Sequence, residues 1–246
     1  MISHDTPARL VDLPGCYNLR DTGGYQAHGG TTRWRTLLRS ASPFLFPEEG
    51  MHALHEMGVH AMIDLRRPSE AEGESYHAAL REGVRYHALP LFDDHAYQVV
   101  DVPANDLDQL YQLILEHCGP QFSRVLHTIA AEEGPLLVHC AIGKDRTGLV
   151  VALTLGAIGV DAQTISDDYA LSFEQLQPLF EQFRSNERAR GGDMERLERF
   201  LASRRETMLE VLAYLEQHHG GIEGYLATHG VDSTVIERLR AKLVTA

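Results

Sequence analysis

Short apolar runs of the length of β-strands alternate with helical patterns in the first half of the chain. The runs rich in Leu, Val and Ile fall at 36 to 42, 59 to 66, 83 to 91 and 133 to 140. The segment 47 to 58 lies between the first two runs and has Pro47 where helices start and Gly58 where they stop. Strands separated by helices require crossover connections, which favour parallel pairing. We therefore expect an α/β fold with a central, mainly parallel sheet of about four to five strands flanked by helices.

The second half of the chain is predicted to be helical. Segment 104 to 134 has apolar residues at helical spacing and an interruption at Gly119 and Pro120, which indicates two helices or one kinked helix. After residue 144 no strand is expected, and the pattern predicts helices at 144 to 158, 161 to 170, 172 to 189, 193 to 218, 221 to 229 and 232 to 244. The charged, glycine-containing stretch 184 to 193 is predicted to be a linker or part of a lid. We expect one domain over 1–246, with possible lid helices within 161–192.

Composition excludes several classes of protein. A chain of 246 residues with 43% hydrophobic residues can bury a sizeable core, which excludes disordered and fibrous proteins. Its net charge of −13 repels phosphate backbones, so we expect no nucleic-acid partner, and any anionic substrate must be held by local groups.

Cysteine and histidine usage indicates neither a disulfide framework nor a metal site. Three cysteines without a CxxC pair and 14 scattered histidines lead us to expect no metal and no cofactor. The longest apolar run, 149 to 160, has 12 residues and is too short to span a bilayer, so we expect no integral membrane association. No basic and apolar leader opens the sequence. We expect a cytoplasmic protein, with signal-independent secretion as the alternative.

The segment from 135 to 159 combines a strand, a loop and a helix in a way that favours anion binding. A loop that enters a helix N-terminus directs backbone N–H groups and the positive end of the helix dipole at one point. Cys140 opens the predicted loop, where this field would stabilise a thiolate nucleophile. Arg146, six residues later, can bind two phosphate oxygens, and Gly143 permits the tight bend.

The same spacing occurs a second time, at Cys118 and Arg124. That pair does not follow a strand and has Pro120 where an N–H donor is needed, so we interpret Cys118 as a buried structural thiol.

The loop sequence HCAIGKDRTG, 139 to 148, resembles the phosphate-binding loop of cysteine-dependent protein tyrosine and dual-specificity phosphatases. Its Lys-Asp pair is similar to the atypical bacterial branch, whose members act on phosphotyrosine, phosphoserine or phosphothreonine, and phosphoinositides. Three other segments also resemble that branch: NLRDTGGY at 18 to 25, IDLRRPSE at 63 to 70 and DDYALS at 167 to 172. The C-terminal GGIEGYL and IERLRAKL do so as well, so the resemblance covers nearly the whole chain and implies a tyrosine-phosphatase-like fold.

The resemblance implies a role for each residue of the loop. Cys140 corresponds to the nucleophile and Arg146 to the phosphate-binding arginine, and the backbone of 141 to 145 forms the phosphate cradle. Phosphate-binding positions are therefore Ala141, Ile142, Gly143, Lys144 and Arg146. Thr147 corresponds to the hydroxyl that hydrogen-bonds the sulfur, and His139 either orders the loop or merely ends the strand.

Asp145 corresponds to the aspartate that the atypical branch uses as general acid, because the chain has no WPD loop at its single tryptophan, Trp34. The simpler interpretation is that Asp145 caps the helix or pairs with an arginine. Asp93, Asp94 and Asp64 are the alternative acids.

The remaining basic residues leave alternatives open. Lys144 either adds a second cation at the pocket mouth, which would suit substrates with several phosphates, or is solvated at the helix start. Arg20 and Arg66 are expected to bond buried carboxylates rather than reach the pocket. Lys242 is expected at the surface.

These features predict a phosphoric monoester hydrolase that acts through a phosphocysteine. We expect a protein tyrosine phosphatase, with phosphoserine, phosphothreonine or phosphoinositide activity also possible. Its partners would be a phosphorylated protein or phosphoinositide as substrate and inorganic phosphate as product. Two alternatives are a rhodanese-like sulfurtransferase, which also places a cysteine in an anion-binding loop, and a non-catalytic phosphoprotein-binding module.

Overall fold

A five-stranded sheet lies at the centre of the protein in a computed structural model that describes residues 9–72, 83–93 and 104–246. The strand order is β1 (Arg20–Asp21), β4 (Leu37–Ser40), β7 (Leu136–His139), β5 (Ala61–Asp64) and β6 (Arg85–Ala88). All neighbours pair in parallel except β1, which is antiparallel to β4. The predicted mainly parallel α/β sheet is therefore confirmed, with β1 as the strand that the hydrophobic pattern missed.

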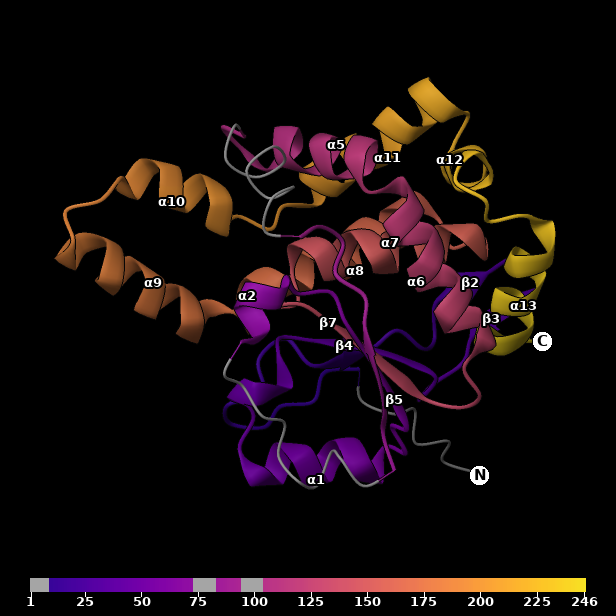
Figure 1. The fold of residues 1–246 in the computed structure, drawn as a ribbon, viewed down its shortest axis with the longest axis horizontal. Coiled ribbons are helices and arrows are strands. Elements are labelled where there is room, and N and C mark those ends of the chain that lie inside the picture. The colour runs from indigo at the N-terminus through magenta and orange to yellow at the C-terminus, as the bar shows by residue number, and fades with distance from the viewer. Residues whose placement is uncertain (1–8, 73–82, 94–103) are drawn as a thin grey trace, which may run out of the picture.

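The two faces of this sheet bury different sets of side chains, because successive residues of a strand point to opposite sides. Leu38, Met62 and Leu137 join the cluster beneath α1 (Glu48–Glu56), which covers one face. Their neighbours Leu37 and Ile63 belong to the larger core on the opposite face, under the remaining packed helices (Figure 1). The three central strands are fully buried, which explains why they appear as continuous apolar runs rather than alternating ones.

Helix α7 (Asp145–Ala157) is the central helix of the larger core, and its side chains from Thr147 to Leu155 are all buried. It contacts α6 (Gly119–Ala131), α8 (Ala162–Gln175), α12 (Ile222–Thr228) and α13 (Ser233–Leu243). Two further helices, α5 (Leu107–His117) and α11 (Arg205–His219), pack outside it. The predicted interruption near Gly119 is real, since α5 and α6 are separate helices that meet at Cys118. Two short elements that the pattern did not predict are the 3₁₀ helix Pro43–Leu45 and α2 (Pro68–Ala71).

A second, three-stranded antiparallel sheet contradicts the expectation that no strand occurs after residue 144. It contains β2 (Gln26–Ala27), β3 (Gly30–Thr32) and β8 (Val244–Thr245), in that order. These strands have two or three residues each, so they contain no periodic pattern that a sequence could reveal. Their pairing joins the C-terminal end of the chain to the N-terminal region.

Two predicted helix boundaries are also wrong. The segment 193 to 218 forms α10 (Met194–Leu201) and α11, separated by extended backbone at Ala202. No Gly or Pro marks this break; instead, Lys144 Nζ donates to the carbonyls of Phe200 and Ala202, and Ser203 Oγ donates to Tyr169 O. The predicted break between the helices 161 to 170 and 172 to 189 lies at Leu176, because α8 continues to Gln175. The second of these helices is α9 (Gln177–Ala189), which ends at residue 189 as predicted, so the expected linker 184 to 193 is helical up to that point. Arg184 of α9 bonds Glu198 of the adjacent helix.

Helices α9 and α10 form an arm that projects from the body of the protein (Figure 1). Its base contains an apolar cluster in which Leu176 and Phe180 are fully buried, and Ile142 of the 140–144 loop packs against this cluster. Within 161–192, α8 packs into the body and only α9 lies in the arm. A lid role for these helices stays a prediction.

The loop of interest leaves the sheet at the carboxyl ends of its parallel strands. In the strand register, His139 at the end of β7 lies opposite Ser40 of β4 and Asp64 of β5. The segments that follow these three strands therefore meet at one edge of the sheet, where α/β proteins place their ligands. Within the described residues, no helix is both long and apolar enough to span a membrane.

Truncating a side chain between the sheet and α1 should cost much of the stability. We expect Leu137→Ala, at a fully buried position, to lower the free energy of unfolding by about 3 kcal/mol in urea titrations. The matched change Leu45→Ala, at a position 46% exposed, should lower it by less than about 1 kcal/mol. Equal losses in the two variants would contradict the assignment of the core.

Candidate active site

The carbonyl groups of the 140–144 loop are bonded to the elements around it. Ala141 O accepts from Ser42 N, and Ile142 O accepts from Asn18 Nδ2 at 3.1 Å. Gly143 O accepts from Asn18 Nδ2 and from Arg39 Nη2, both at 2.9 Å. Gly143 has a φ of +68°, and a Cβ there would lie 2.1 Å from Ser40 O, so the bend requires glycine.

The N–H groups of the same loop are left free. Those of residues 141–145 donate to no other group in the described part of the chain. The first turn of α7 directly follows them, so the positive end of its dipole adds to the field of these donors. Free N–H groups at a helix start are the donors that the predicted anion-binding site requires.

A buried ionic network supports this loop from beneath. The Asp168 carboxylate accepts from Arg20 Nε at 3.1 Å, from Arg39 Nη1 at 2.5 Å and from Tyr25 Oη at 3.0 Å. Burial opposes the charge of Asp168, but the two guanidinium groups outweigh it and hold the pKa of this carboxyl well below its usual range. Two arginines against one carboxylate leave a net positive charge under the loop, which favours an anion above it. The expected buried pairing of Arg20 is confirmed.

Arg146 lies on the first turn of α7, close to Cys140. Its Nη1 and Nη2 donate to the two oxygens of Glu70 at 2.6 and 2.7 Å, and its guanidinium carbon lies 5.6 Å from the centre of the Phe92 ring. Burial disfavours its charge, but the Glu70 bonds and the nearby Cys140 and Asp145 raise its pKa above the ordinary value. The Nε–H and one Nη2–H bond to nothing in the described residues, so one edge of the guanidinium remains for a ligand.

Glu70 lies in the segment IDLRRPSE, and no role was expected for it from the sequence. In the structure it bonds Arg146. Burial opposes its ionisation, but the bonds and charges of Arg146 and Arg67 outweigh this and lower its pKa to about 2. A charged Glu70 therefore fixes the orientation of Arg146 at neutral pH.

Asp145 follows the loop as the first residue of α7, and its side chain is 26% exposed. Its Oδ1 accepts from Tyr111 Oη at 2.6 Å and lies 3.1 Å from Lys144 Nζ. It lines a cavity of about 180 Å³ together with Arg67, Glu70, Phe92, Leu110, Ile114 and Arg146. A cysteine, an arginine and an aspartate thus surround one anion-binding loop beside a cavity.

A sequence model described as the tyrosine phosphatase family matches residues 11–245 of the chain. The protein belongs to the tyrosine phosphatase family. A tyrosine-protein phosphatase of Nostoc commune is 32% identical over 215 residues, which cover 84% of this chain and 73% of that protein. The triple specificity protein phosphatase PtpB of Mycobacterium tuberculosis is 26% identical over 277 residues, which cover 95% of this chain and 98% of that protein.

Among solved structures, TpbA of P. aeruginosa is 19% identical and covers 88% of this chain and 97% of its own, with a TM-score of 0.42. Membership of the tyrosine phosphatase family favours phosphatase chemistry over the sulfurtransferase alternative.

The Lys144 side chain lies neither at the pocket mouth nor in solvent, the two places predicted for it. It is 1% exposed, and its Nζ donates to Phe200 O at 2.6 Å and to Ala202 O at 2.8 Å. The ammonium therefore fixes the junction of α10 and α11 and is neither solvated nor a second cation at the pocket mouth. That the backbone of Lys144 forms part of the phosphate cradle stays a prediction. Lys242 is also half-buried rather than at the surface, and it donates to Ile129 O and Glu132 O.

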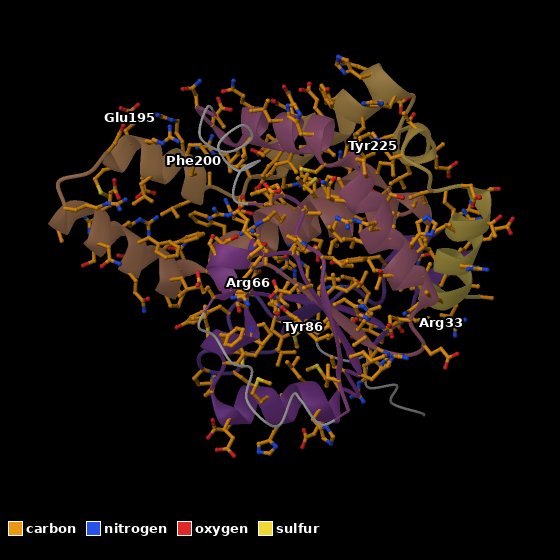
Figure 2. All side chains as sticks on the ribbon, in the orientation of Figure 1. Arg33, Arg66, Tyr86, Glu195, Phe200 and Tyr225 are labelled. Carbon is orange, nitrogen blue, oxygen red and sulfur yellow. The ribbon has the colours of Figure 1, made fainter. Side chains whose placement is uncertain are left out.

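His139 and Asp64 form a buried support at the end of the strands. His139 Nδ1 lies 3.3 Å from Cys140 O and 3.8 Å from Asp64 Oδ1. Asp64 also accepts from Arg66 and Tyr86, whose side chains Figure 2 places near the sheet edge below α2. Burial raises the pKa of Asp64, but the charges of His139 and Arg66 and the bonds from Arg66 outweigh it and hold the pKa low. Asp64 is therefore a poor alternative acid, and the expected buried pairing of Arg66 is confirmed.

Thr147 does not make the expected bond to sulfur in this state. Its hydroxyl is buried and has no hydrogen-bond partner in the described ranges.

Asp93 is exposed after β6, and Asp94 lies outside the described residues. The other cysteine–arginine pair is no site, because Cys118 is buried, with its pKa raised to about 12 by burial, while Arg124 is exposed on α6. No group of metal-binding side chains occurs in the ranges described.

His139 should make stability fall in acid. Burial lowers its pKa from 6.5 to about 4, against the opposing effect of Asp64. Between these values the unfolded chain binds a proton that the folded chain does not, so stability is lost as the pH falls from about 6.5 toward 4. We expect the free energy of unfolding to fall less in His139→Gln than in the unmodified protein between pH about 7 and about 4.5, by up to about 3 kcal/mol. Urea unfolding at the two pH values measures this difference. Other buried groups titrate in both proteins, so an identical acid loss in the variant would contradict the assignment.

Proposed function

We propose that this tyrosine phosphatase hydrolyses phosphate monoesters through a phosphocysteine formed on Cys140. One observation carries the proposal: Cys140 and Arg146 flank a loop whose N–H groups are free while its carbonyls are bonded elsewhere. A phosphoryl group bound there would have a nucleophile below it and donors around its equatorial oxygens.

In the first step, the Cys140 thiolate attacks phosphorus and the phosphorus–oxygen ester bond breaks. The loop N–H groups and the free edge of Arg146 stabilise the charge on the equatorial oxygens. Asp145 gives its proton to the leaving oxygen, so an alcohol or phenol departs. Glu70 holds the other edge of Arg146 and keeps the guanidinium from rotating.

In the second step, water attacks phosphorus and the sulfur–phosphorus bond breaks. Asp145, now a carboxylate, takes a proton from the water, and Cys140 leaves as a thiolate. Inorganic phosphate departs, and the protonated Asp145 is ready for the next cycle. Thr147, with its buried hydroxyl free, is placed on the helix turn next to the loop and would donate to the departing sulfur after a rotamer change.

We infer phosphotyrosine in proteins as the first substrate class. The cavity beside Asp145 and Arg146 has an apolar wall of Phe92, Leu110 and Ile114, which suits an aromatic ring. The relative named a triple specificity phosphatase supports a wider range, including phosphoserine and phosphothreonine. A phosphoinositide headgroup has weaker support, because the Lys144 ammonium bonds backbone carbonyls, whereas Arg67 lines the cavity and would meet a second phosphate.

Removing the nucleophile should separate turnover from binding. We expect Cys140→Ser to lower kcat for an aryl phosphate by at least about 1,000-fold, because a serine hydroxyl is not ionised at neutral pH. Inorganic phosphate should still bind, since the loop N–H groups and Arg146 remain. The measurements are steady-state kinetics and calorimetric titration with phosphate, and a Cys140→Ser protein with full turnover would exclude the phosphocysteine.

Removing the acid should depend on the leaving group. We expect Asp145→Asn to lower kcat/KM by about 100-fold or more for an alkyl phosphate, whose leaving oxygen needs a proton, and by less for an activated aryl phosphate. The alkaline fall of the pH–rate profile should also disappear. An unchanged profile would move the acid role to Asp93 or Asp94.

A further inference from the structure

The two carboxylate oxygens of Asp145 have different surroundings. Oδ1 accepts a hydrogen bond from the Tyr111 hydroxyl at 2.6 Å and lies 3.1 Å from Lys144 Nζ. Oδ2 makes no hydrogen bond within the described residues. The Lys144 ammonium can only donate, and the Tyr111 hydroxyl uses its one proton to donate to Oδ1, so Oδ1 already accepts from two donors. A proton on Asp145 is therefore directed to Oδ2.

The surroundings of Tyr111 fix its position and keep its hydroxyl protonated. It comes from α5, is fully buried, and stands edge-on to Tyr169 of α8, with ring centres 6.1 Å apart. The two hydroxyls are 2.7 Å apart. Burial and the negative charge of Asp145 raise the pKa of Tyr111 well above its usual value. Because Tyr111 uses its single proton toward Asp145, the proton between the two tyrosines belongs to Tyr169.

We propose that Tyr111 is the positioning residue of the general acid: its hydroxyl occupies Oδ1 of Asp145, leaving Oδ2 to hold the proton and deliver it to the leaving oxygen. The inference rests on the acid role proposed above for Asp145. It assigns a function to the hydroxyls of Tyr111 and Tyr169. Packing alone does not require these hydroxyls, because phenylalanine would fill the same space. It also explains how a side chain that is 26% exposed is held in one orientation.

The sign of the pH effect follows from the charges around Asp145. The cations Lys144 and Arg146 and the Tyr111 donor favour the carboxylate, whereas negative groups nearby favour the protonated acid. The titratable or charged groups that face this site are Tyr111, Tyr169, Lys144, Arg146, Cys140, Arg67 and Glu70. Removing the Tyr111 hydroxyl deletes one donor to the charged form.

The test is the pH dependence of kcat/KM for Tyr111→Phe with an aryl phosphate. We expect the alkaline limb, where the acid loses its proton, to move up by about one pH unit, the size of one hydrogen bond to a charged group. The plateau should fall by up to about tenfold, because a less fixed carboxyl group transfers its proton less efficiently. This fall should be larger for an alkyl than for an activated aryl phosphate, a difference that a purely structural role would not produce.

Two further tyrosines make the comparison specific. Tyr169→Phe removes the hydroxyl that is hydrogen-bonded to Tyr111 rather than to Asp145 itself. It should move the alkaline limb of the pH profile in the same direction by a smaller amount. This variant keeps the proposal testable if Tyr111→Phe folds poorly. Tyr225→Phe is the matched control. Tyr225 lies on α12 and is equally buried, and its hydroxyl donates to the carbonyl of Leu115 on α5. It lies apart from the Arg66 region of the site (Figure 2). Its profile should match that of the unmodified protein.

Asp145→Asn separates the two levels of the proposal. If that variant keeps the alkaline limb, the acid role of Asp145 fails and the inference about Tyr111 fails with it. If Asp145→Asn loses the limb while folded Tyr111→Phe and Tyr169→Phe superimpose on the unmodified profile, only the positioning role is overturned. In support of the proposal, adding Tyr111→Phe to Asp145→Asn should cause no further loss of rate.

Discussion

The phosphate loop depends on hydrogen bonds that its carbonyls make away from the ligand. A peptide group is planar, so fixing the direction of a carbonyl also fixes the N–H on the opposite side of the same unit. Asn18 and Arg39 bind the carbonyls of Ile142 and Gly143, which directs the N–H groups of Gly143 and Lys144 to the opposite side. The bond from Ser42 N to Ala141 O does the same for the Ile142 N–H. Asn18 itself has a φ of +57°, a conformation that asparagine tolerates better than most residues. The anion site is therefore a product of the residues around the loop as much as of the loop itself.

Positive charge close to the loop offsets the repulsion that the net negative charge of the molecule exerts on phosphate. The chain has a net charge of −13, yet Arg20 and Arg39 exceed Asp168 by one charge under the loop. These groups are buried, so salt and solvent screen them less than they screen surface charges. Arg146 adds a guanidinium whose direction Glu70 fixes. This local positive charge favours the phosphate that the proposed mechanism requires, on a protein whose overall charge repels polyanions.

The sequence predicted the parts of this structure that follow from periodicity and short-range geometry. The four apolar runs of strand length and the strand–loop–helix order around Cys140 and Arg146 contain the necessary information in contiguous residues. The strands of two or three residues do not, because they depend on partners far along the chain. The break between α10 and α11 depends on the Lys144 ammonium, which binds carbonyls 56 and 58 positions away. Glu70 and Tyr111 were missed for the same reason: each reaches the loop from another segment, 76 and 34 positions away. A family resemblance placed the loop residues, but it could not tell where the Lys144 side chain points.

The most direct test is a crystal structure of the protein with inorganic phosphate, the expected product. The account predicts phosphate oxygens within hydrogen-bond distance of the N–H groups of 141–145 and of the Arg146 Nε edge. Asn18 and Arg39 should still hold the Gly143 carbonyl, and Glu70 should still hold the other edge of Arg146. Phosphate bound elsewhere, or a loop whose carbonyls rather than N–H groups face it, would contradict the account.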